Sequence, residues 1–88
     1  MQKGGSDLER KYIRAVTPKE NYILQLEFVT GSVLQLDLSK RLSGIRLRPL
    51  RDPDVWRSAV TNGIYVRWGD TELSYDELLS MASEEPPF

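Results

Sequence analysis

Residues 21–38 read NYILQLEFVTGSVLQLDL, and this stretch decides the fold. Apolar and polar residues alternate on both sides of a short Thr30-Gly31-Ser32 break, which is the period-two pattern of half-buried strands. Gly31 can take the positive φ that a tight turn requires. The pattern predicts an antiparallel hairpin with one apolar face, made by these residues: Tyr22, Leu24, Leu26, Phe28, Leu34, Leu36 and Leu38.

The segments on either side of the hairpin extend the sheet. KYIRAV at 11–16 reads as a first strand that ends before Pro18. IYVRW at 64–68 reads as a later strand with Trp68 on its apolar face. GIRLRPLR at 44–51 is either an extended edge segment or an irregular connector, because Pro49 excludes a central strand.

Two helices are expected after the hairpin. Asp52 can cap a helix that has Pro53 at its first position and runs to about Val60, with Trp56 docked on the sheet. A second helix is expected over 74–81. The sequence therefore predicts an α+β fold: a small antiparallel sheet in the order three strands, helix, strand, helix, with the helices packed on one face.

The length of 88 residues predicts a single domain, since a chain of this size cannot support two cores. We expect this domain over 12–82, with flexible tails at 1–11 and 83–88, where the sequence ends in EEPPF. The first ten residues lack the apolar core of a signal peptide, and no apolar run is long enough to span a bilayer. A cytoplasmic bacterial protein is the expectation.

Composition argues against most enzyme classes. The chain has no cysteine and no histidine, which removes thiol nucleophiles, the usual zinc ligands and the commonest general base. We also find no nucleophile and base pair and no phosphate-binding loop. The sequence therefore predicts a non-enzymatic protein with no catalytic, metal-binding or cofactor-binding residues.

An acidic cluster at RWGDTELSYDEL, residues 67–78, has a structural explanation. Ser74 and Glu77 fit the S-x-x-E capping box, and Leu73 and Leu78 stand where the hydrophobic staple needs apolar residues. Asp76 would lie in the first turn, near the positive end of the helix dipole. A calcium site is not expected, because the ligand spacing of calcium loops is missing.

Charge is unevenly distributed although the net charge is -1. Five basic residues without an acid occupy one segment: Lys40, Arg41, Arg46, Arg48 and Arg51. Every charged residue after Arg67 is acidic. One interpretation is that the two segments are neighbours that screen one another. The alternative is that the basic segment contacts a partner or nucleic acid, and that Asp70 and Glu72 form an acidic partner face.

Several short motifs together resemble the small bacterial family named domain of unknown function 2442. They are Phe28-x-x-Gly31, Leu36-Asp37-Leu38, Leu50-x-Asp52 with Trp56, Trp68, and the helix start from Leu73 to Leu78. Trp56 replaces the usual Phe, and Glu72 stands where Asp is usual. The resemblance implies a small α+β domain without an established activity. Some relatives lie beside toxin-antitoxin genes, and others continue into a helix-turn-helix from which DNA binding is not carried over to this chain.

Two functions are compatible with these observations. The first is a protein-protein interaction module, in one version an antitoxin-like partner of a basic toxin, suggested by the acidic C-terminal third. The alternative is a nucleic-acid-binding accessory protein that uses the segment from Lys40 to Arg51. The chain could be a monomer, or a homodimer formed through a free strand edge at 11–16 or 44–51.

Overall fold

The computed structural model describes residues 11–84, which form two three-stranded antiparallel sheets and a C-terminal helix. The first sheet has the order β1 (Ile13–Lys19), β2 (Ile23–Phe28), β3 (Val33–Asp37), and the second has the order β4 (Val60–Thr61), β5 (Tyr65–Trp68), β6 (Thr71–Ser74). This α+β architecture confirms the predicted fold class. The predicted tails fall largely on residues 1–10 and 85–88, outside the described residues.

The predicted hairpin is confirmed as β2 and β3. Leu24 pairs with Leu36 and Leu26 with Leu34, which places these leucines on one face of the sheet. Leu24, Leu26 and Leu36 are fully buried there. Gly31 provides the expected positive φ, 95°, in the turn.

The first strand does not stop before Pro18, as the sequence predicted, but continues to Lys19. Pro18 pairs with Leu24 of β2. The bond from Leu38 N to Tyr22 O shows that Tyr22 turns its backbone groups toward β3, and Leu24, two residues later in the strand, does the same. The backbone nitrogen of Pro18, which carries no hydrogen, therefore faces away from β2. Because β1 is an edge strand of its sheet, Pro18 disrupts no ladder bond.

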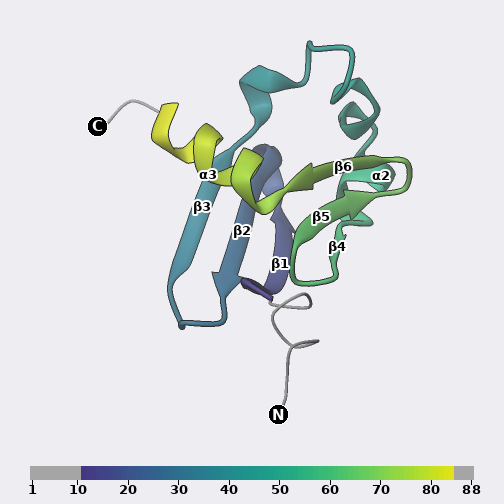
Figure 1. Cartoon of the computed structure of the whole chain (residues 1–88). Coiled ribbons are helices and arrows are strands. Elements are labelled where there is room, and N and C mark those ends of the chain that lie inside the picture. Colours follow the sequence, from purple (N-terminus) through teal and green to yellow (C-terminus); the bar gives the residue numbers. More distant parts are fainter. Residues whose placement is uncertain (1–10, 85–88) are drawn as a thin grey trace.

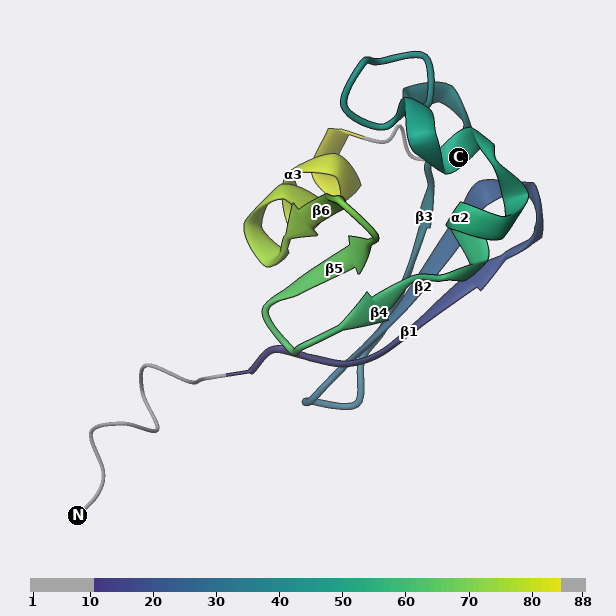
Figure 2. The same cartoon turned by 90° about the vertical axis from the view of Figure 1, so that its right-hand side faces the viewer.

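Gly63 connects the two sheets. Its carbonyl accepts hydrogen bonds from the N–H groups of Tyr12 (2.8 Å) and Ile13 (2.9 Å) at the start of β1. The short strand β4 consequently lies beside β1, and α3 and the second sheet lie on the same side of the first sheet (Figures 1 and 2). Strands β4 and β6 were not predicted from the sequence, and they complete the second sheet around β5.

The segment at 44–51 is the irregular connector, ending in the 3-10 turn η3 (Arg48–Arg51). Helix α2 (Pro53–Arg57) is shorter than the predicted span to Val60, because Val60 belongs to strand β4 and pairs with Arg67 of β5. Its start is as expected, since the Asp52 carboxylate accepts from Asp54 N at 2.9 Å.

Two tryptophans form the centre of the core. Trp56 of α2 and Trp68 of β5 stack with centroids 5.9 Å apart and are 5% and 1% exposed. Trp68 Nε1 donates to Trp56 O (3.1 Å), and Trp56 Nε1 donates to Lys19 O (2.9 Å) at the end of β1. The predicted docking of Trp56 on the sheet is thereby confirmed.

Helix α3 (Tyr75–Glu84) follows β6 directly and extends past the predicted domain end at residue 82. Tyr75 N donates to Ile64 O (2.9 Å), and the Tyr75 ring stacks on Tyr12 with centroids 4.4 Å apart. Among the described helices, none is long and apolar enough to cross a membrane.

We expect the Gly63→Ala substitution to destabilise the fold more than Gly31→Ala. Both residues have a positive φ, 101° and 95°, so both substitutions carry the strain of a left-handed alanine, about 1–2 kcal/mol. Only at Gly63 would the new Cβ also meet the Lys11 side chain, at 2.6 Å. Equal losses in urea-unfolding free energy for the two variants would contradict this role of Gly63.

Candidate nucleic-acid interface

The basic segment at 39–51 links the first sheet to α2 and has an apolar and a charged side. It begins with the 3-10 turn η2 (Ser39–Arg41) and ends with η3. Leu42, Leu47 and Leu50 are buried, while Lys40, Arg46, Arg48 and Arg51 are exposed. Leucines therefore hold the segment on the core and leave these cations at the surface.

Arg46 is used to hold the segment on α3. Its guanidinium makes a bidentate ion pair with Glu77, with Nη2 2.9 Å from Oε1, and Nη2 also donates to Glu72 O at 2.8 Å. Arg41 reaches the same helix, where its Nη2 donates to Met81 O at 3.5 Å. The interpretation that the basic and acidic segments are neighbours is confirmed for Arg46.

Glu77, the partner of Arg46, belongs to the predicted capping box, and the structure confirms this box. Ser74 N donates to Glu77 Oε1 at 3.0 Å, and Glu77 N donates to Ser74 Oγ at 3.1 Å. Hydrogen bonds from Arg46 and from Ser74 N lower the pKa of Glu77 to about 2. The staple residues Leu73 and Leu78 are fully buried. Glu77 thus stabilises both the helix start and the attachment of the basic segment.

Lys40 lies at the other end of the segment, beside Asp37. The Ser39 hydroxyl donates to Asp37 Oδ1 at 2.6 Å and Ser39 N does so at 2.9 Å, which fixes the start of η2. These bonds, followed by the charge of Lys40, lower the pKa of the Asp37 carboxyl. Lys40 itself is exposed to solvent.

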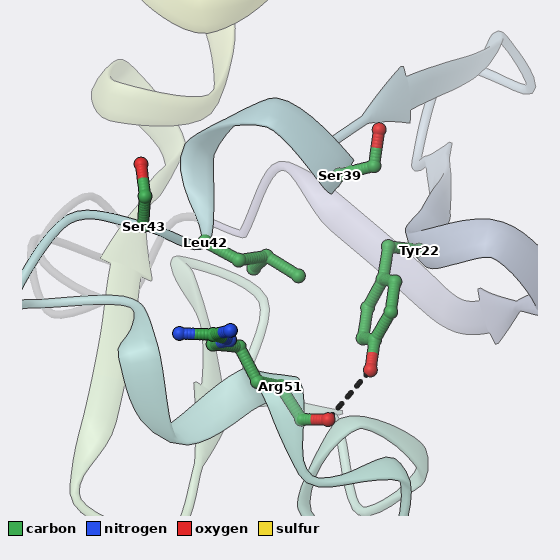
Figure 3. Close-up of a pocket in the computed structure, with 5 residues that line it drawn as sticks. All are labelled: Tyr22, Ser39, Leu42, Ser43 and Arg51. Atoms are coloured by element: carbon green, nitrogen blue, oxygen red, sulfur yellow. Dashed lines mark hydrogen bonds between the residues drawn. The ribbon is translucent and has the colours of Figure 1, made fainter.

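Arg48 and Arg51 are exposed, and neither forms an ion pair with a residue between 11 and 84. Arg51 borders a shallow hollow of about 420 Å³, lined also by Tyr22, Ser39, Leu42 and Ser43. Figure 3 shows the Arg51 guanidinium beside Leu42, with the two serine hydroxyls pointing away from it. The Tyr22 hydroxyl donates to Arg51 O at 2.7 Å, which fixes the backbone of η3.

Tyr22 was not recognised as part of this site from the sequence. Its alternation with Leu24 predicted an inward-facing strand residue. Its ring does pack against the core, but Tyr22 lies in the turn between β1 and β2 with φ 61°, next to Asn21 with φ 63°. Asparagine tolerates this conformation but tyrosine seldom adopts it. The hydroxyl bond to Arg51 and the edge contact of the ring with Trp56, at 5.1 Å, hold it there. Asn21 was the available signal for a left-handed turn.

The two residues of the predicted acidic face lie on the β5–β6 hairpin in different environments. Glu72 Oε1 is 3.5 Å from Arg67 Nη2, so part of its charge is screened by the neighbouring strand. Asp70 is exposed in the turn and has no ion pair within residues 11–84. Asp70 is therefore the better placed of the two carboxylates to meet a partner.

The charged side chains of the basic segment are of a kind that can bind anions. Residues 11–84 contain no group of three or more acidic side chains placed to hold a metal ion. The Arg51 guanidinium at this hollow can bind an anion by hydrogen bonds, whereas the hydroxyl of Ser39 is already bonded to Asp37. The sequence prediction of a chain without catalytic or cofactor-binding residues stays a prediction.

Comparison with known proteins gives one structural similarity to report. No family model and no curated protein matches the chain. A crystal structure from Nitrosomonas europaea ATCC 19718, described as a "putative DNA binding protein", is similar with a TM-score of 0.69 and 30% sequence identity. The match covers 85% of this chain and 50% of that one, so the chain spans about half the length of that protein. The resemblance to domain of unknown function 2442 stays a prediction.

Glu77→Gln is expected to lower stability above pH 4.5 and to have little effect near pH 2. Glutamine can still accept from Ser74 N, so the substitution removes mainly the ion pair with Arg46. Because folding lowers the Glu77 pKa from 4.5 to about 2, its stabilisation is complete above pH 4.5 and is lost as the pH falls through this interval. Screening at this half-exposed site limits the effect to roughly 1 kcal/mol.

Chemical denaturation of both proteins at several pH values measures this difference. Asp70→Asn is the matched control, because it neutralises a carboxylate on the neighbouring hairpin that has no ion pair within residues 11–84. A Glu77→Gln loss that persists unchanged at pH 2 would show that the ion pair is not its cause.

Proposed function

We propose that the chain is a small non-enzymatic binding domain that contacts a nucleic-acid backbone through Lys40, Arg48 and Arg51. The observation that carries this proposal is the exposure of Arg48 and Arg51 without an ion pair to any residue in 11–84. The similarity to a protein described as DNA-binding supports nucleic acid, among polyanions, as the ligand.

The backbone that carries these arginines is well fixed. Leu50, between them, is fully buried, Tyr22 donates to Arg51 O, and the next residue caps α2. Guanidinium groups make bidentate bonds to phosphate oxygens, and a fixed backbone reduces the entropy lost on binding. The two arginines on this fixed backbone are thus suited to binding phosphate groups.

Arg46 contributes little to this contact, because its guanidinium is already bound to Glu77 and to Glu72 O. With three phosphate contacts at most, the affinity should fall with salt at a logarithmic slope of roughly -3 on duplex DNA. Phosphate contacts carry no base readout, so the binding should be independent of sequence.

The double substitution Arg48→Gln/Arg51→Gln should reduce the slope of log K against log salt by about 2, since each phosphate contact contributes about 0.9. Arg14→Gln/Arg57→Gln makes the same change in charge at arginines that pair with Glu27 and Asp54, and it should leave the slope nearly unchanged. Fluorescence anisotropy of a labelled random-sequence duplex, titrated at several salt concentrations, measures both slopes.

Equal slopes for the two double variants would show that only overall charge matters and would contradict this interface. Wild-type protein without salt-dependent binding to duplex or single-stranded DNA would contradict the proposed function. Thermal unfolding of each variant confirms that the fold is intact before titration.

The second candidate is a protein-protein interaction module, in its narrower form an antitoxin-like partner of a basic toxin. Asp70 supports it, as an exposed carboxylate at the tip of the β5–β6 hairpin without an ion pair in residues 11–84. An acidic tip of this kind would attract a cationic protein at low salt.

Asp70→Asn/Glu72→Gln should weaken the binding of a labelled oligolysine peptide and leave duplex binding unchanged. The substitutions remove the two carboxylates of the hairpin without touching Arg48 or Arg51. Fluorescence anisotropy with both probes separates the candidates. Oligolysine binding that is unaffected by these substitutions would exclude this hairpin as the acidic face.

A further inference from the structure

Strand β3 is an edge of the first sheet that no other strand of residues 11–84 covers. The bonds from Phe28 N to Ser32 O and from Leu38 N to Tyr22 O show that the even-numbered residues of β3 turn their backbone groups to β2. By alternation, Val33 and Gln35 turn their N–H and C=O groups outward. No backbone partner for these groups lies within residues 11–84. Unpaired edge groups of this kind can pair with another strand.

The opposite edge, on β1, is protected against such pairing. It has an irregular register between Ile13 and Ala15, and Pro18 lacks a donor on the outward side. Strand β3, with the sequence VLQLD, has an unbroken register and contains neither proline nor lysine. Its exposed Val33, at 57%, adds apolar surface to the edge. A proline and an irregular register are thus present on the β1 edge and absent from the β3 edge.

We propose that β3 pairs antiparallel with β3 of a second copy of this chain. In the register with Leu34 opposite Leu34, Val33 of each copy lies opposite Gln35 of the other. The outward backbone groups of these residues then form four hydrogen bonds across the twofold axis. Leu34, half-buried on the apolar face, gains its copy as a close neighbour.

Charge in this register is compatible with self-pairing. Asp37 is the one charged residue of the VLQLD strand, and it falls opposite Gly31 of the other copy. No like charges of the two strands therefore stand opposite each other. This places the dimer interface on β3 and not at 11–16 or 44–51, where the sequence suggested it. A contact this small predicts a dimer that dissociates on dilution.

Sedimentation equilibrium of the full chain tests the proposal at protein concentrations up to several hundred micromolar. The wild-type mass should rise with concentration from that of one copy, 10.1 kDa, toward twice that value. Val33→Lys/Gln35→Lys puts lysines opposite each other across the axis and should raise the dissociation constant at least about tenfold. Val33→Glu/Gln35→Glu should do the same.

An equimolar mixture of the lysine and glutamate variants should form a heterodimer, because every facing pair is then of opposite charge. Thr17→Lys, an exposed change on β1, should leave dimerisation unchanged. A wild-type chain that stays monomeric throughout would overturn the proposal. So would a dimer that the lysine variant does not weaken, or folded charge variants that fail to associate when mixed.

Discussion

The contact between Trp56 and Trp68 is the constraint on which the rest of the structure depends. The stacked rings place α2 against β5, and the two indole N–H groups bond to Trp56 O and Lys19 O. One pair of side chains thereby joins the second sheet, the short helix and the end of β1. A helix of five residues has little stability of its own, so this tertiary contact maintains α2.

The position of Arg51 depends on the same pair of tryptophans. Trp56 also supports Tyr22, whose hydroxyl donates to the carbonyl of Arg51, and the C-terminal end of η3 is therefore fixed. At the other side of the segment, Arg46 is bound to the cap of α3. The basic segment thus divides into two arginines that contact α3, Arg41 and Arg46, and three exposed cations, Lys40, Arg48 and Arg51, which are the ones proposed to contact a ligand.

Local patterns predicted the hairpin over 21–38 and the cap at Ser74, because strand alternation and helix capping depend on residues close in sequence. The two-residue strand β4 carries no such pattern, and neither does the left-handed Tyr22, which is held by contacts with Trp56 and Arg51. All five cations of the basic segment were recognised as candidates. Their division was not predictable, since Glu77 lies 31 residues from Arg46 in the sequence.

The most direct test of this division is a map of the contact surface by heteronuclear NMR. Unlabelled duplex DNA is added to the isotope-labelled chain, and the chemical shift change of each backbone and arginine side-chain N–H is recorded. The largest changes should fall on Lys40, Arg48, Arg51 and the neighbouring Tyr22, with little change at the Arg46 side chain. Changes centred on Arg46, or confined to the β5–β6 hairpin, would contradict the division of the cations and the interface built on it.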